Sequence, residues 1–239
     1  MRAQRAAFLG IMAAVLLICC RVKNTIPAAA PAEISETKYV ALTFDDGPRA
    51  NTTGRLLDGL RERGASATFF LIGRQIAGNE DLVRRMKDEG HQIGNHTWDH
   101  VTLYGKSAAM VEGEICKTNE AIRDILGDGT YWVRPPYGLL NENQRCCFST
   151  PLAHWSVDPK DWKLKNAQKV TAAVLEKIQP GDIVLLHDFY ATSVDAALQI
   201  VDTLEAEGYE FVTVEELLAL YDIAPQAGVF YTDAREKTE

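Results

Sequence analysis

Three features are scarce or absent in the sequence, and two of these absences exclude a class of protein. The five cysteines follow no metal-ligand spacing, which excludes a closed, cysteine-bound zinc site. Residues 25–239 carry 21 basic and 33 acidic side chains, a formal charge of −12, which disfavours binding to nucleic acid or anionic lipid surfaces. No strong internal repeat or low-complexity tract is visible, and 239 residues suit one domain with an N-terminal appendage.

The few cysteines leave disulfide bonding open. Cys19 and Cys20 belong to an N-terminal apolar run, so Cys116, Cys146 and Cys147 remain for the folded part. Outside the cytoplasm Cys116 could pair with one of the other two and leave one thiol over. Three free thiols are an equal alternative.

A long apolar run occurs at the N-terminus, where Arg2 and Arg5 precede the uncharged residues 6–20. A basic start followed by an apolar run of this length predicts an export signal, and the run is short for a transmembrane helix. We assign residues 1–23 to a cleaved signal peptide or a retained signal anchor. Residues 24–37 read as a proline- and alanine-rich linker. The protein is therefore expected outside the cytoplasm, secreted or held at the membrane.

From residue 38 the chain alternates short β-branched or aromatic runs with amphipathic stretches, as βα units do. Seven strands are expected, at Tyr39–Phe44, Ala67–Ile72, Gln92–Gly94, Tyr131–Val133, Ala153–Val157, Asp182–Leu186 and Glu210–Val214. Helices are expected near 53–64, 80–89, 107–126, 166–179, 193–207 and 215–221. This rhythm predicts an α/β fold with a parallel sheet, closed or partly closed into a barrel. The segment Asn141–Pro151 is too short and too interrupted for a crossover helix.

Polar side chains follow the ends of five of the predicted strands. They are Asp45-Asp46, His96, Arg134, Asp158 and His187. In parallel α/β barrels the active site is built at the C-terminal ends of the strands. The five clusters are therefore expected to meet at one site. Other polar and aromatic residues are assigned to structure or packing: His91, His154, Trp155 and Tyr190.

His96 and His100 are four residues apart, which on a helical turn places two imidazoles on one face, about 6 Å apart. Alone, such a histidine pair is more often a chance occurrence or part of a solvated face, and Asp45-Asp46 before a Gly-Pro pair equally fits an ordinary turn. Two histidines with Asp46 would leave positions open on a metal ion, as catalysis requires. We expect Asp46, His96 and His100 to hold a divalent ion, with Asp45 free to take a proton.

Five segments, in this order, closely resemble the five motifs of the polysaccharide deacetylase family, carbohydrate esterase family 4, also called the NodB-homology domain. They are Thr43-Phe44-Asp45-Asp46-Gly47-Pro48, His96-Thr97-Trp98-Asp99-His100, Arg134-Pro135-Pro136-Tyr137, Asp158-Pro159-Lys160-Asp161-Trp162 and Leu185-Leu186-His187. The resemblance covers roughly residues 38–222, the expected catalytic domain, and leaves 223–239 as a C-terminal tail. It implies a deformed (β/α) barrel of about seven parallel strands and one divalent metal ion, Zn²⁺ or alternatively Co²⁺ or another divalent ion.

By motif position, the resemblance implies that Asp46, His96 and His100 ligate the metal. Asp45 corresponds to the general base that takes a proton from the attacking water. His187 corresponds to the general acid that protonates the departing amine.

The resemblance also implies supporting roles around these groups. The backbone N–H of Tyr137 would stabilise the oxyanion. Arg134 would orient the base and Asp161 the acid. Trp162 and Leu185 would wall the pocket for the acetyl methyl group, next to Tyr137. The sequence departs from the family pattern after the third motif, where residues 146–151 stand in place of a usually longer helix.

These roles predict an N-deacetylase that acts on N-acetylglucosamine or N-acetylmuramic acid units of a cell-wall polysaccharide, most naturally peptidoglycan, and releases acetate. Alternatives within the family are a chitin-oligomer deacetylase and an O-acetyl xylan esterase. A non-catalytic sugar-binding relic of the fold is an alternative of another class. We expect a monomer whose partner is the acetylated polysaccharide, with no nucleic acid and with an N-terminal segment that contacts the membrane if it is retained.

Overall fold

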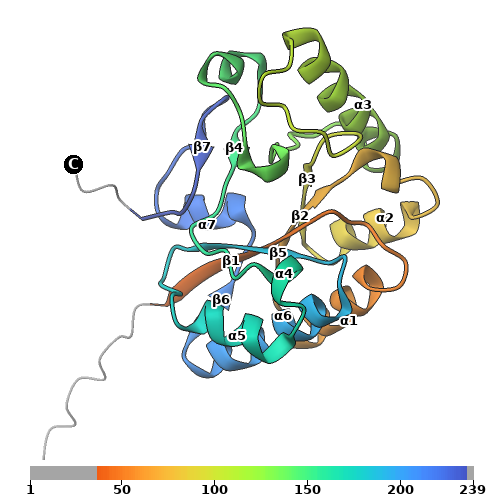
Figure 1. Ribbon diagram of the computed structural model, residues 1–239. Helices are drawn as coiled ribbons and strands as arrows, with labels where there is room; N and C mark the ends of the chain where they lie inside the picture. Colours follow the sequence, from red (N-terminus) through yellow and green to blue (C-terminus); the bar gives the residue numbers. More distant parts are fainter. Residues whose placement is uncertain (1–36, 236–239) are drawn as a thin grey trace, which may run out of the picture. The chain divides into compact units, whose positions relative to one another are not determined.

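The computed structural model describes residues 37–235 (Figure 1). The predicted signal segment and nearly all of the predicted linker lie outside the described residues. Within residues 37–235, no helix is both long and apolar enough to cross a membrane.

Five parallel strands form the main sheet. The central strand β1 (Lys38–Asp45) pairs with β5 (Ile183–His187) from Ala41 onward. The start of β1 pairs with β6 (Tyr209–Phe211), and its end pairs with β2 (Thr68–Leu71). The strand β3 (Gln92–Asn95) pairs with β2. Because parallel neighbours need crossover connections, helices link the strands.

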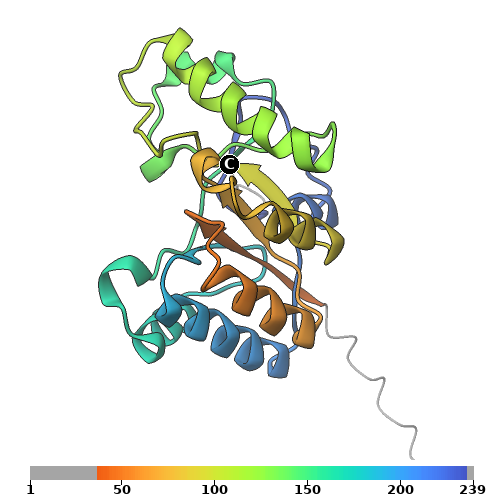
Figure 2. The ribbon, with the colours of Figure 1, turned by 90° about the vertical axis from the view of Figure 1, so that its right-hand side faces the viewer.

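Seven α-helices lie among the described residues: α1 (Thr53–Arg63), α2 (Glu80–Asp88), α3 (Ala108–Leu126), α4 (Asp161–Leu164), α5 (Ala167–Leu175), α6 (Ala191–Ala206) and α7 (Val214–Leu220). Helix α6 packs between α1 and α5, and Figure 2 shows α1 and α6 side by side along one face of the sheet. Helix α3 packs against α2 and β3. Short 3₁₀ turns occur at η1 (Gly73–Gln75), η2 (Pro136–Gly138) and η3 (Glu142–Cys147).

Alternation along β1 separates the core from the site. Val40, Leu42 and Phe44 point into the apolar layer formed with α1 and α6, where each is at most 1% exposed. Successive strand residues point to opposite faces, so Thr43 and Asp45 lie on the other side of the sheet. Both are buried there and contact Arg134. The hydrophobic periodicity of β1 thus directs Asp45 away from the helical layer.

The α/β fold with a parallel sheet is confirmed, but a regular seven-stranded barrel is not. The expected strand at residues 131–133 is reduced to bridges from Val133 to Asn95 and to Leu152. The expected strand at 153–157 is replaced by β4 (Leu152–Ala153) and by a separate bridge between Val157 and Val184. Prolines 135, 136 and 151 beside these segments have no N–H to donate to a sheet, so regular pairing stops there.

The C-terminal part differs from the sequence-based expectation in two places. The predicted strand 210–214 ends at Phe211, because Thr213 and Glu216 form a capping box that starts α7. The predicted tail contains β7 (Phe230–Tyr231), which pairs in parallel with β4, so the folded part extends beyond residue 222. Elsewhere, η3 takes the place of a crossover helix in 141–151, as predicted. Cys116, Cys146 and Cys147 are free and exposed.

Candidate metal centre and active site

The predicted site residues meet at the C-terminal ends of the strands. Most of them line one cavity of about 370 Å³, which contains Asp45, Asp46, His96, His100, Tyr137, Trp162, Leu185 and His187. Arg134 and Asp161 are fully buried behind this surface and contact Asp45 and His187. Every residue that the sequence assigned to the site therefore lies in the cavity or directly behind it.

Asp46, His96 and His100 present three ligand atoms within 4.8 Å of one another. The Asp46 Oδ1 atom lies 3.3 Å from His100 Nε2 and 3.6 Å from His96 Nε2. This carboxylate oxygen is buried without a hydrogen-bond partner, which is costly unless a cation compensates it. His96 donates its Nδ1–H to the carbonyl oxygen of Arg134 at 2.7 Å, which leaves Nε2 free to bind an ion. The three residues fit one divalent metal ion.

The backbone bends sharply at this centre. Of seven non-glycine residues with positive φ in residues 37–235, four belong to it: Asp46, Thr97, His100 and Tyr137. Non-glycine residues in this region cost energy and persist where the surroundings fix them, often at functional sites. At Asp46 (φ 73°) the backbone turns and the strand alternation ends, so the two adjacent carboxylates contact different neighbours.

Asp45 is held by a buried arginine. Arg134 Nη1 donates to Asp45 Oδ1 at 2.8 Å and to Thr43 Oγ1 at 2.7 Å. Burial alone would raise the pKa of Asp45, but the charges of Arg134, His96 and His187 and the Arg134 hydrogen bond together lower it. Asp45 is therefore a carboxylate at neutral pH, with Oδ2 at 3.6 Å from His96 Nε2.

His187 is held by a buried carboxylate. Its Nδ1–H donates to Asp161 Oδ1 at 2.8 Å, and its backbone N–H donates to Asp161 Oδ2 at 2.8 Å. Burial favours the neutral imidazole, but the hydrogen bond and charge of Asp161, with the charges of Asp45 and Asp46, raise the pKa of His187 to about 9. The imidazole is therefore protonated at neutral pH and lines the same cavity as Asp45, its register partner on the neighbouring strand.

The outer wall of the cavity is aromatic. Tyr137, with φ of 63°, is 62% exposed, and its ring lies edge-on to His100 at 5.1 Å. Its backbone N–H has no hydrogen-bond acceptor within residues 37–235. Trp162 is 47% exposed, whereas Leu185 is buried at the base. An amide N–H without an acceptor and an apolar wall suit a small acyl group.

One lining residue was not assigned to the site from the sequence. Trp155, expected to be a packing residue, packs on the core and also lines the cavity. Asp158 lines the cavity too, as expected for one of the five polar clusters that follow strand ends. The predicted structural roles of His91 and His154 agree with their contacts. His91 Nδ1 accepts the Ala67 N–H, and the His154 carbonyl accepts from Arg134.

A second residue that sequence reasoning left out lies behind the site. Asp188 is fully buried and accepts a hydrogen bond from the Thr53 hydroxyl. Burial, with smaller contributions from Asp46 and Asp45, raises the pKa of Asp188 to about 7. A Cβ atom on Gly47 would lie 2.6 Å from Asp188 Oδ2, so the turn after Asp46 sits directly on this carboxyl group. In the sequence, the sign that Asp188 lies near the site was that it directly follows His187.

Comparison with known proteins shows the family to which this chain belongs. A family model described as polysaccharide deacetylase matches residues 32–146. The peptidoglycan-N-acetylglucosamine deacetylase PgdA of Listeria monocytogenes is 41% identical over 196 residues, which are 82% of this chain and 41% of that protein. A solved structure described as a T48 deacetylase with substrate is 42% identical with a TM-score of 0.78, over 82% of this chain and 96% of that one. The chain belongs to the polysaccharide deacetylase family.

The same family contains enzymes with other substrates. The structure of a family 4 acetyl xylan esterase from Clostridium thermocellum, solved with a cobalt ion, is 31% identical with a TM-score of 0.79. It is matched over 83% of this chain and 100% of that one. The chain spans less than half the length of the Listeria deacetylase, so the activity of that whole protein does not transfer directly.

Proposed function

We propose that this protein removes N-acetyl groups from N-acetylglucosamine or N-acetylmuramic acid units of peptidoglycan and releases acetate. The observation that carries the proposal is the division of the adjacent carboxylates. Asp46 faces two histidines, while Asp45 is paired with Arg134 and lines the same cavity as a protonated His187. The name of the Listeria relative, a peptidoglycan-N-acetylglucosamine deacetylase, supports the substrate.

Asp46, His96 and His100 would hold the divalent ion, and two imidazoles with one carboxylate favour Zn²⁺. Co²⁺ or another divalent ion is the alternative, which the cobalt-bound relative supports. When bound, such an ion lowers the pKa of water toward about 7 and polarises a carbonyl oxygen.

Asp45 would act as the general base. It is ionised, it lies beside the ligand atom of His96, and Arg134 fixes its orientation. Asp45 would accept a proton from the water that attacks the acetyl carbon. A positioned base of this kind contributes about 10²–10⁴-fold to the rate.

His187 would act as the general acid. An amide nitrogen is a poor leaving group unless it gains a proton as the C–N bond breaks. Asp161 keeps His187 protonated at neutral pH and points it into the cavity. The proton passes to the sugar nitrogen, and the products are acetate and a free amine. The Tyr137 N–H would donate to the oxyanion, and a donor of this kind is worth about 3 kcal/mol.

An O-acetyl xylan esterase is the second candidate, because the Clostridium esterase is similar over most of this chain. An ester has a better leaving group than an amide and depends less on proton transfer to that group, so a protonated His187 favours the amide substrate. We also propose that the protein acts outside the cytoplasm as a monomer, secreted or held by residues 6–20.

Acetate release from defined substrates tests the proposal. Peptidoglycan, chitin oligomers and acetylated xylan are each incubated with the protein, with and without chelator and added Zn²⁺. We expect metal-dependent acetate release from peptidoglycan above that from xylan. Release from xylan alone would show that the N-deacetylase proposal is wrong.

A further inference from the structure

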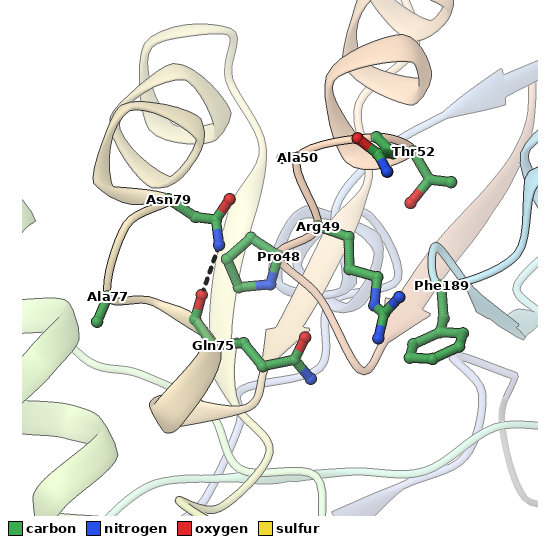
Figure 3. A pocket seen from close by; sticks show the side chains of 9 residues that line it. Pro48, Arg49, Ala50, Thr52, Gln75, Ala77, Asn79 and Phe189 are labelled. Carbon is green, nitrogen blue, oxygen red and sulfur yellow. Dashed lines mark hydrogen bonds between the residues drawn. The ribbon is translucent and has the colours of Figure 1, made fainter.

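A second cavity lies beside the metal centre at the start of α1 (Figure 3). We call it the Arg49 cavity. Its volume is about 440 Å³, and it is lined by residues 48–52, Gln75, Ala77, Asn79 and Phe189. Such a volume is within the range of sites that bind small molecules.

The Arg49 cavity adjoins the metal centre through an intermediate hollow. This hollow shares Asp46 and His100 with the metal cavity, and it shares Arg49, Gln75 and Phe189 with the Arg49 cavity. The two sites are also linked directly, because Gln75 Nε2 donates to the Asp46 backbone carbonyl at 2.9 Å. A polymer with one sugar at the metal centre would place a neighbouring group over the Arg49 cavity.

The cavity presents one charge, and it is positive. Arg49 is its only charged lining residue, although residues 25–239 carry a formal charge of −12. The Arg49 guanidinium stacks 3.3 Å from the ring centroid of Phe189, and Figure 3 shows the two side chains together. Among the arginines of residues 37–235, only Arg49 and Arg145 have no ion pair with an acid. Stacking covers the face of the guanidinium and leaves its N–H edge to a ligand.

Thr52 supplies a second unpaired group in the lining. It is only 9% exposed, and its hydroxyl oxygen has no hydrogen-bond partner. Although Thr52 is the residue that precedes α1, its side chain makes no capping bond. A buried hydroxyl normally forms a hydrogen bond, so the Thr52 hydroxyl is available to form one with a bound group. The positive end of the α1 dipole begins at the next residue and also favours an anion.

We propose that the Arg49 cavity binds a carboxylate of the glycan next to the sugar that is deacetylated. The inference rests on the proposed function and deepens it, because it makes Arg49 a residue that determines substrate choice. Chitin oligomers carry no carboxylate, whereas peptidoglycan carries one on the lactyl ether of peptide-free N-acetylmuramic acid or several on its stem peptides. A guanidinium edge can bind a carboxylate through two parallel N–H bonds.

Four oligomers of equal length test the proposal on the zinc-loaded full chain. They are a neutral N-acetylglucosamine tetramer, a peptide-free N-acetylglucosamine–N-acetylmuramic acid tetrasaccharide, its lactyl methyl ester, and the tetrasaccharide with stem peptides. Both kcat/KM for acetate release and Kd from calorimetry are measured. We expect the free acid or the peptide form to exceed the methyl ester about tenfold, the size of a charge-assisted hydrogen bond. The better of these two forms identifies the source of the carboxylate.

Variants assign the preference to the cavity. Arg49→Gln is expected to remove most of the tenfold preference, and Thr52→Val to reduce it. Arg145→Gln is the matched control, because Arg145 also stacks on an aromatic ring, that of Phe230 at 5.2 Å, without an ion pair. It should leave both the preference and the activity unchanged.

The outcomes separate this inference from the proposed function. Equal Kd values for acid, ester and peptide forms in the unchanged protein would overturn the inference even if no variant folded. A folded Arg49→Gln protein that keeps the preference would also overturn it. If no oligomer releases acetate but the Kd values still differ tenfold and respond to Arg49→Gln, the proposed function fails and the inference stands.

Discussion

Arg134 Nη1 lies 2.8 Å from Asp45 Oδ1, and both side chains are almost completely buried. This pair distinguishes Asp45, the proposed general base, from Asp46, which lies beside the two histidines. We expect Asp45→Asn to lower kcat by about 10²–10⁴-fold, because the base is lost, while metal binding is kept. His96→Ala should lose both metal and activity. Metal content by mass spectrometry and acetate release check the prediction, and wild-type activity in Asp45→Asn would contradict the proposed mechanism.

The same pair makes a prediction about stability. Arg134→Met leaves the buried Asp45 carboxylate without its cation, which should lower the free energy of unfolding by about 3–5 kcal/mol. Arg55→Met is the control, because the pair between Arg55 and Asp195 is 44% and 47% exposed. Removing such an exposed pair should cost about 1 kcal/mol or less. Urea unfolding of both variants provides the comparison, and equal losses would contradict the importance of burial.

Much of this site could be predicted from the sequence, because each functional side chain follows a strand and parallel strands place their ends together. Asp45 and Asp46 have different neighbours because the alternation of β1 ends at Asp46, a residue in the left-handed conformation. Such a turn is determined by the local sequence. The roles of Asp46, His96 and His100 were supported by spacing and by the five ordered motifs.

The parts that could not be predicted depend on contacts between distant segments. The two residues of β7 show no strand periodicity of their own and pair with β4, some 78 positions earlier in the chain. Trp155 lines the cavity because the chain after Ala153 is irregular. The alternation of polar and apolar residues does not predict the direction of a side chain in such a segment. The buried position of Asp188 likewise depends on Thr53 and Gly47, which are far away in sequence.

His187 predicts how activity depends on pH. In the proposed mechanism activity needs its protonated form, so kcat/KM should fall as pH rises through the pKa of about 9. Asp161→Asn removes a carboxylate that raises this pKa, so the fall should begin at lower pH. Asp158→Asn is the control, since Asp158 lines the same cavity but does not bond to His187. A pH profile of Asp161→Asn identical to that of the wild type would rule out this role for Asp161.

Chelation tests whether the ion is catalytic or structural. The large apolar core between the sheet and the helices does not involve Asp46, His96 or His100, so the fold should persist without an ion. A chelator should abolish acetate release, leave the circular dichroism spectrum unchanged, and be reversed by added Zn²⁺. Loss of the spectrum on chelation would indicate a structural metal protein instead.

Gly47 is predicted to be indispensable for the metal centre because of what lies beneath it. In Gly47→Ala, the new Cβ would lie 2.6 Å from Asp188 Oδ2, closer than carbon and oxygen approach each other. Asp188 is fully buried and bonded to Thr53, so we expect the turn to move and Asp188 to stay in place. Because Asp46 precedes Gly47, that movement displaces the carboxylate that faces the two histidines.

We therefore expect Gly47→Ala to bind Zn²⁺ at least tenfold more weakly than the wild type, as measured by competition with a chelator. Gly113→Ala is the matched control, since Gly113 lies inside α3 and a Cβ there meets no atom within 4 Å. Alanine in a helix is about 1 kcal/mol more favourable than glycine, so Gly113→Ala should be slightly more stable and keep its metal affinity. Unchanged zinc affinity in Gly47→Ala would show that Asp188 yields to the new methyl group and does not hold the turn.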